Sequence, residues 1–132
     1  MRKLISATAI CLFVIVASAF ISQSGDPLTK QSDGTYVINT TTLAQDVKGY
    51  LSNTPLKIYI KKDKIQKIEA LSNQETPKFF QRVKTAMLSK WNGKTVKAAQ
   101  KLKVDGVTGA TLSSNALKEN VARGLDYYMK NK

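Results

Sequence analysis

Hydroxyl side chains and glycines gather near the end of the chain, in the stretch V-D-G-V-T-G-A-T-L-S-S-N-A-L that runs from Val104 to Leu117. The glycines allow a positive φ and let another group approach the backbone closely. A predicted helix follows, and a helix start presents unpaired N–H groups with about half a positive charge. The stretch therefore predicts a phosphate-binding turn at a helix start. Its small and polar residues are Asp105, Gly106, Thr108, Gly109, Ala110, Thr111, Ser113 and Ser114.

An alternative interpretation of this stretch is structural. Any of the four hydroxyls at Thr108, Thr111, Ser113 and Ser114 can cap the helix that follows. The turn also lacks the Gly-Lys-Ser/Thr ending of a P-loop, so it does not predict a nucleoside triphosphate site of that type.

The chain contains no histidine and a single cysteine, Cys11, which lies in an apolar run near the N-terminus. Without an imidazole the chain cannot form a Ser-His-Asp triad, a histidine-held haem or an ordinary zinc site. Removal of the N-terminal segment would also leave no thiol for a disulfide or for iron–sulfur ligation. These compositional features favour a carrier or a binding protein over a stand-alone enzyme.

The chain is strongly basic, with 21 Lys and Arg against 9 Asp and Glu and a net charge of +12. This balance favours contact with phosphates, anionic lipids or acidic partners. Nucleic acid is not the expected partner, because the chain carries no nucleic-acid-binding motif. The densest basic cluster could contact a membrane surface or an acidic redox partner, but a solvated strand face is the favoured interpretation. We call this cluster the hairpin lysines: Lys57, Lys61, Lys62, Lys64 and Lys67.

The N-terminal segment predicts export. A positively charged start precedes an uncharged run of 18 residues, Leu4 to Ile21, and Ala17-Ser18-Ala19 provides a cleavage site. Residues 1–19 are therefore predicted to be a secretory signal peptide. The run also reaches the minimum length of a membrane-spanning helix, so an uncleaved N-terminal anchor is the alternative. Either interpretation places the remainder in the periplasm or on the outer face of the cytoplasmic membrane, behind a polar linker at residues 20–32.

The remaining 100 residues form a single predicted domain with strands first and helices after. Ordered structure is expected to begin at the turn Asp33-Gly34. Leu56, Ile58 and Ile60 alternate with polar residues, which is typical of a half-buried antiparallel strand. After a tight turn at residues 62–64, the alternation breaks at Lys67 and Ile68, which indicates a β-bulge. The predicted strands cover residues 35–38, 55–61 and 65–71.

Helical periodicity follows. Pro77 suits a first helical turn, and an apolar stripe runs from Phe80 to Trp91 before the stop signal Asn92-Gly93. A shorter helix is predicted over residues 95–102. A C-terminal helix is predicted from the stripe Leu117, Val121, Leu125 and Tyr128. The expected fold is α+β, a small hairpin-based antiparallel sheet packed against two or three helices.

The stretch Asp105-Gly106-Val107-Thr108-Gly109-Ala110-Thr111 resembles the flavinylation motif of the FMN-binding domain family. That family's pattern is Asp, two variable positions, Ser or Thr, Gly, Ala and Thr. The chain is thereby similar to the C subunit of the sodium-translocating NADH:quinone reductase and the G subunit of the Rnf complex. Gly34-Thr35-Tyr36, Lys48-Gly49-Tyr50 and Glu75-Thr76-Pro77 also occur in the family's order. The resemblance covers residues 33–132, which are identified as an FMN-binding domain.

The resemblance implies a covalent cofactor. In the family, the last Thr of the motif carries FMN through a phosphoester bond, which places the bond on Thr111 of this chain. A separate flavin transferase uses FAD as the FMN donor and releases AMP, so no histidine of this chain is needed. Asp105 is then expected to serve recognition by the transferase or to hold the turn. Thr108, Gly109, Ala110, Leu112, Ser113 and Ser114 are expected to surround the cofactor.

Two further groups of residues are weaker candidates for the flavin site. Glu75 and Thr76 resemble the family segment that approaches the flavin, and the alternative is a plain strand-to-helix connection. Aromatic side chains could flank the flavin ring, although at helical spacing core positions are favoured. These aromatic residues are Phe79, Trp91, Tyr127 and Tyr128.

The expected function is extracytoplasmic electron transfer. The domain would pass electrons between a membrane electron-transport protein and a further acceptor, with the flavin supplying the redox chemistry. One alternative is a self-contained flavin-dependent reductase of a small acceptor. The other is a non-redox surface protein that binds polyanions through its lysines.

Overall fold

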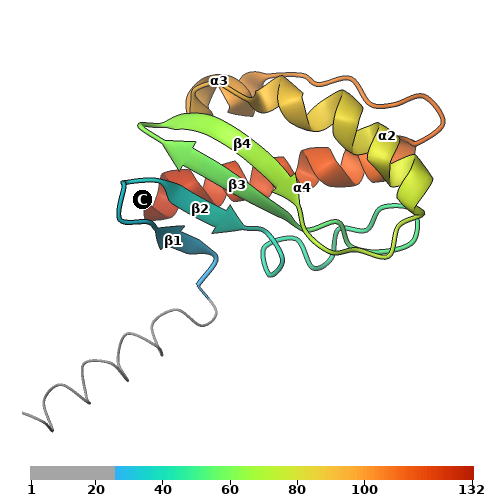
Figure 1. The fold of residues 1–132 in the computed structure, drawn as a ribbon, viewed down its shortest axis with the longest axis horizontal. Coiled ribbons are helices and arrows are strands. Elements are labelled where there is room, and N and C mark those ends of the chain that lie inside the picture. The colour runs from blue at the N-terminus through green and yellow to red at the C-terminus, as the bar shows by residue number, and fades with distance from the viewer. Residues whose placement is uncertain (1–25) are drawn as a thin grey trace, which may run out of the picture.

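The computed structural model describes residues 26–132, which form a four-stranded antiparallel sheet with helices packed on one face (Figure 1). The strands follow one another across the sheet in the order β1-β2-β3-β4. This arrangement confirms the expected α+β class with three helices. The strands are β1 (Leu28–Lys30), β2 (Tyr36–Asn39), β3 (Leu56–Lys61) and β4 (Lys64–Ala70).

The central hairpin confirms the alternation read from the sequence. Leu56, Ile58 and Ile60 are fully buried on the helix-covered face, and intervening β3 residues are only half-buried. The pairing register of β3 and β4 shifts between Tyr59 and Ile60, which leaves Gln66 as the extra residue of a bulge. The bulge therefore lies one position before the predicted Lys67–Ile68, because Gln66 and Lys67 are both exposed between the buried Ile65 and Ile68.

The sheet begins earlier than the sequence predicted. Residues 28–30, expected within the linker, form the edge strand β1, which pairs with β2 through Leu28↔Ile38 and Lys30↔Tyr36. A three-residue edge strand is too short to show a period-two pattern, so the prediction missed it. The predicted Asp33-Gly34 turn is present, with the Thr35 N–H donating to Asp33 Oδ1 at 3.0 Å. The predicted signal peptide and the first part of the predicted linker lie outside the described residues.

The helices begin where their local signals predict. Pro77 occupies the first turn of α2 (Pro77–Met87), and the Thr95 hydroxyl caps α3 (Val96–Lys101) by accepting from the Ala98 N–H at 3.2 Å. The predicted single stripe to Trp91 is divided, because the last turn tightens into the 3₁₀ helix η1 (Leu88–Trp91). Among residues 26–132, no helix has the length and apolar character needed to cross a membrane.

The C-terminal helix α4 (Thr111–Asn131) lies against the sheet and beside α2 (Figure 1). Its predicted stripe is confirmed, since Leu117, Val121, Leu125 and Tyr128 are all buried. Gly124 allows the close approach, because a Cβ at this position would lie 2.6 Å from Ile58 Cδ1. At 21 residues, α4 spans about 30 Å.

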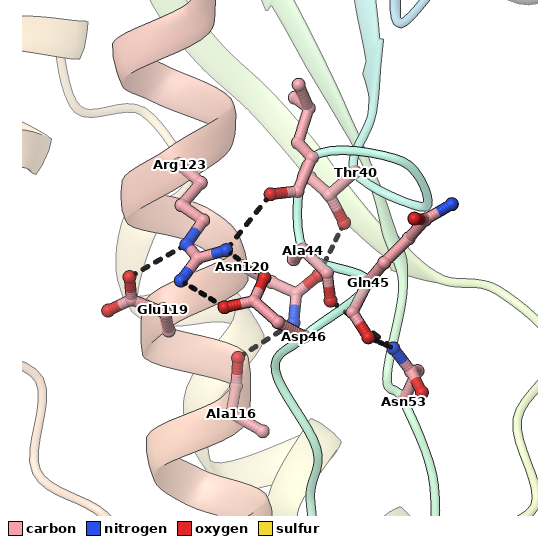
Figure 2. A network of polar contacts seen from close by, with 10 residues as sticks. Thr40, Ala44, Gln45, Asp46, Asn53, Ala116, Glu119, Asn120 and Arg123 are labelled. Carbon is pink, nitrogen blue, oxygen red and sulfur yellow. Dashed lines mark hydrogen bonds and ion pairs between the residues drawn. The ribbon is translucent and has the colours of Figure 1, made fainter.

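The connection from β2 to β3, residues 40–55, is bonded to α4 through two side chains of that helix (Figure 2). Buried Asn120 accepts from the Thr40 hydroxyl at 2.6 Å and donates to the Ala116 carbonyl at 2.8 Å. Arg123 donates to the Leu43 carbonyl at 3.2 Å and pairs with Asp46. The connection therefore has a fixed position relative to α4 before it reaches residues 49–53.

Candidate functional site

A pocket of about 510 Å³ opens between the starts of α2 and α4 and the connection at residue 50. This volume lies within the range of about 300–1,000 Å³ that is usual for small-molecule sites. The pocket combines apolar side chains with the predicted turn, and seven of the sequence-predicted site residues line it. Its lining residues are Tyr50, Glu75, Thr76, Phe79, Phe80, Gly109, Ala110, Thr111, Leu112 and Ser113.

The start of α4 presents backbone donors at this pocket. The first helical hydrogen bond runs from the Ser114 N–H to the Ala110 carbonyl at 3.0 Å, so the preceding N–H groups have no helical acceptor. Ala110 occupies the N-cap position and provides no side-chain cap. Gly109 turns the chain into the helix with a φ of 83°. Unpaired donors and the helix dipole give this end of the pocket a positive potential.

The hydroxyl side chains between Val104 and Leu117 make different contacts. Ser114, 1% exposed, accepts from the Val107 N–H at 2.9 Å and so closes the turn. Ser113 donates to Glu75 at 2.9 Å. Thr111, by contrast, is exposed at the first position of α4, and its hydroxyl has no hydrogen-bond partner within residues 26–132. The capping alternative therefore does not account for Thr111.

The two glycines of the stretch also differ, and the expectation of a positive φ is correct only for Gly109. Gly106 instead permits a close approach, because a Cβ there would lie 3.0 Å from Ser114 Cβ. The reason is that the turn folds back against the first residues of α4. Asp105 and Thr108 are exposed and do not line the pocket. In the described part of the chain the Asp105 carboxylate accepts no hydrogen bond, so the turn is closed by Ser114 and not by Asp105.

Glu75 is a buried carboxylate, 6% exposed, at the other side of the pocket. Its Oε1 accepts from the Tyr50 N–H at 2.7 Å and from the Ser113 hydroxyl at 2.9 Å. Its Oε2 accepts from the N–H groups of Leu51 at 2.6 Å and Ser52 at 3.2 Å. A buried charge is tolerable only when it is well bonded, and here four donors supply that compensation. The carboxylate thus connects three segments that form the pocket.

Apolar side chains form the rest of the pocket. Phe79 is 54% exposed, Tyr50 72% and Leu112 55%, and each faces the pocket from a different segment. Thr76 is the extended residue before α2, and its side chain makes no capping hydrogen bond. Exposed apolar side chains around a concavity are typical of a ligand site.

Only one of the four predicted aromatic candidates lines the pocket. Phe79 does, whereas Trp91 and Tyr128 are core residues at 3% and 2% exposure, as aromatics at helical spacing usually are. Tyr127 is half-buried on α4 away from the pocket lining. The sequence prediction missed Tyr50 and Phe80 as pocket residues. Periodicity could not find Tyr50, because it lies in an irregular connection.

None of the hairpin lysines lines this pocket, and two of them form ion pairs among the described residues. Lys67 contacts Glu69 at 2.7 Å and lies over the Tyr59 ring, and Lys61 contacts Asp33 at 3.9 Å. These exposed pairs contribute little stability, and they reduce the free positive charge of this face.

A second hollow of about 480 Å³ lies beside β1 and β2, and none of the sequence-predicted site residues lines it.

Comparison with known proteins gives one match. The family model described as "FMN-binding domain" matches residues 49–126. This range contains every residue that lines the pocket between α2 and α4. No curated protein and no solved structure matches the chain.

Proposed function

Because the chain belongs to the FMN-binding domain family, we propose that it carries FMN covalently on the γ-oxygen of Thr111 and acts as an electron carrier. The single observation that carries this proposal is the state of that hydroxyl. Thr111 lines the pocket, is exposed, and has no hydrogen-bond partner among the described residues, unlike Ser113 and Ser114. A hydroxyl that stabilises nothing in the fold is free to become an attachment point.

The residues present fit a flavin phosphate. The unpaired N–H groups at the start of α4 can donate to phosphate oxygens, and the helix dipole offsets the remaining charge by about 0.3–1 kcal/mol. Phe79, Tyr50 and Leu112 offer apolar surface for a flat aromatic ring. Bound FMN supplies the electron-transfer chemistry, and the chain supplies its position and its surroundings.

Attachment requires a partner enzyme. The bond between Thr111 Oγ and the FMN phosphorus forms, the pyrophosphate bond of FAD breaks, AMP leaves, and the hydroxyl proton is released. The chain has no histidine to act as the base. A flavin transferase that uses FAD must therefore provide the base. The chain's own contribution is an accessible oxygen in a turn shaped by Gly109 and the small residue Ala110.

Export and membrane partners complete the proposal. The uncharged run of 18 residues at the N-terminus supports delivery to the outer side of the cytoplasmic membrane, by a cleaved signal or a retained anchor. Outside the cytoplasm a dissociated cofactor would be lost, so a covalent bond makes occupancy independent of the free FMN concentration. Membrane electron-transport proteins are the corresponding electron donors or acceptors.

Two substitutions at one position test the attachment. The full chain and its Thr111→Val and Thr111→Ser variants are expressed together with a flavin transferase, and their intact masses are measured after denaturation. Wild type and Thr111→Ser should carry the mass of one FMN less one water. Thr111→Val should carry none, and its unfolding midpoint should match that of the flavin-free wild type, because the hydroxyl has no hydrogen-bond partner among the described residues. A flavin adduct on Thr111→Val would overturn the assignment.

A further inference from the structure

Glu75 occupies an unusual position for an acidic residue. Its side chain is 6% exposed, and within residues 26–132 it pairs with no Lys or Arg. Its partners are instead three consecutive backbone N–H groups, of Tyr50, Leu51 and Ser52, and one hydroxyl. Consecutive N–H groups that point inward form an anion-binding concavity, and here a side chain of the same protein fills it.

The segment that Glu75 holds has little other support. Tyr50 and Leu51 are 72% and 58% exposed, so their side chains do not anchor the segment in the core. One backbone hydrogen bond, from the Gly49 N–H to the Ser52 carbonyl at 2.8 Å, closes the segment on itself. Ser52 adds a hydroxyl contact to the Gln74 N–H at 2.9 Å, next to Glu75. The position of this wall of the pocket therefore depends mainly on the carboxylate.

Gly49 shows independently that the carboxylate is seated closely. A Cβ at Gly49 would lie 2.0 Å from Glu75 Oε1, which is far inside contact distance. Gly49 has no positive φ, so backbone conformation is not the reason for a glycine here. The absence of a side chain at residue 49 is what allows the carboxylate to reach the N–H groups.

We propose that Glu75 is a positioning residue of the flavin site, which fixes the Tyr50–Ser52 segment against the start of α4 and keeps a negative charge beside the pocket. This inference rests on the proposed function. The first effect holds Tyr50 and Ser113, two residues of the pocket wall, at a constant separation. The second effect opposes the addition of electrons to a flavin in the pocket, because like charges repel most strongly where water is excluded. Glu75 thereby holds the reduction potential of the flavin low.

We call the four hydrogen bonds that the Glu75 carboxylate accepts the clamp. The clamp is tested first without any flavin. The full-length chain is made without a transferase, and the exchange of single backbone amides is followed by NMR for wild type, Glu75→Gln and Glu69→Gln. Glu69→Gln is the matched control, because Glu69 is half-exposed on the sheet and its only ion pair within residues 26–132 is with Lys67. In Glu75→Gln the amides of Tyr50, Leu51 and Ser52 should exchange at least about tenfold faster, while strand amides keep their wild-type rates.

The charge effect is tested on the flavin-loaded chains, by their midpoint potentials. Glu75→Gln should favour reduction by about tenfold, a positive shift of about 30 mV for a two-electron couple. Glu69→Gln should leave the potential unchanged. A clamp with a purely structural role would alter the exchange rates and not the potential, so an unchanged potential overturns the electrostatic part.

The outcomes separate this inference from the attachment itself. If wild type carries flavin while Glu75→Gln changes neither the exchange at residues 50–52 nor the potential, the role of Glu75 is wrong and the proposed function stands. If wild type carries no flavin while exchange at residues 50–52 still rises locally, the clamp stands and the attachment is wrong. Should Glu75→Gln fail to fold, Gly49→Ala places a Cβ 2.0 Å from Glu75 Oε1 and displaces the carboxylate from the three N–H groups, so unchanged exchange at residues 50–52 in that variant would overturn the clamp.

Discussion

The Ser113 hydroxyl donates a 2.9 Å hydrogen bond to Oε1 of Glu75, although the two residues lie 38 positions apart in the sequence. One residue belongs to the first turn of α4 and the other precedes α2, so this contact joins the two helix starts that form the pocket. The neighbouring Ser114 turns the other way and closes the turn before α4. Between these two serine contacts and the pocket, the Thr111 hydroxyl has no hydrogen-bond partner in the part of the chain that the structure describes.

The turn should depend on Ser114. In Ser114→Ala the part-buried Val107 N–H loses its acceptor, which should lower the free energy of unfolding by about 1–3 kcal/mol. Urea titration of the flavin-free chain measures this change. Ser89→Ala, an exposed serine on η1, is the control and should stay within about 0.5 kcal/mol of wild type. Equal effects of the two substitutions would show that Ser114 does not hold the turn.

Two glycine substitutions should separate the effect of backbone strain from the effect of a steric clash with Glu75. Gly34→Ala has open space around it but a φ of 92°, so it should cost about 1–2 kcal/mol and leave flavin attachment unchanged. Gly49→Ala places a methyl group against Glu75 and should displace residues 50–52. We expect the fraction of chain that carries flavin, measured by intact mass after a fixed reaction time, to fall only in Gly49→Ala. Full attachment in Gly49→Ala would contradict the importance of that wall.

Asn120 should be the most sensitive polar residue of α4. The substitution Asn120→Ala removes its bond to Thr40 (Figure 2). It leaves the buried hydroxyls of Thr40 and Thr54 without this partner. Loss of about 2–4 kcal/mol is expected from the denaturation midpoint. Asn131→Ala, which removes an exposed contact to the Tyr127 carbonyl, should have almost no effect. A small effect at Asn120 would mean that its hydrogen bonds contribute little to holding the connection.

Asp63, in the turn between β3 and β4, should make the free energy of unfolding decrease at acid pH. The hydrogen bond from Tyr128, followed by that from Lys132, holds the pKa of Asp63 below its usual value. A carboxyl whose pKa is lowered on folding stabilises the protein above its unfolded pKa of about 3.9, and this contribution is lost as the pH falls through the folded pKa. The stability advantage of wild type over Asp63→Asn should therefore be present at pH 7 and shrink below about pH 4. Urea titrations at several pH values measure it, and a constant difference would exclude this contribution.

Local patterns predicted most of the elements. The alternation of Leu56, Ile58 and Ile60 and the stripe of α4 each report burial of one face, which neighbouring residues reveal without knowledge of the fold. The prediction failed at β1, because this three-residue strand shows no sequence pattern of its own and is recognised only by its pairing with β2. The prediction also placed the bulge one position too late. Gln66 and Lys67 are both exposed, so the alternation alone does not show which of them is the extra residue.

The candidate site was predicted in part. The motif around Thr111 marked the turn, and Glu75 was identified from its resemblance to a family segment. The bonds from Glu75 to Tyr50, Leu51 and Ser52 join positions more than 20 residues apart. No spacing rule relates a carboxylate to backbone N–H groups at that distance, so its role in holding the pocket required coordinates. The same holds for the division of tasks between Ser113 and Ser114.

The most direct test of covalent attachment at Thr111 is peptide mapping of the wild-type chain after expression with a flavin transferase. Cleavage after Lys103 and Lys118 releases one peptide, residues 104–118, that contains Thr108, Thr111, Ser113 and Ser114 together. Fragmentation of this peptide should place the flavin phosphate on Thr111, with the other three hydroxyls unmodified. An unmodified peptide, or a flavin on any other residue, would contradict the assignment.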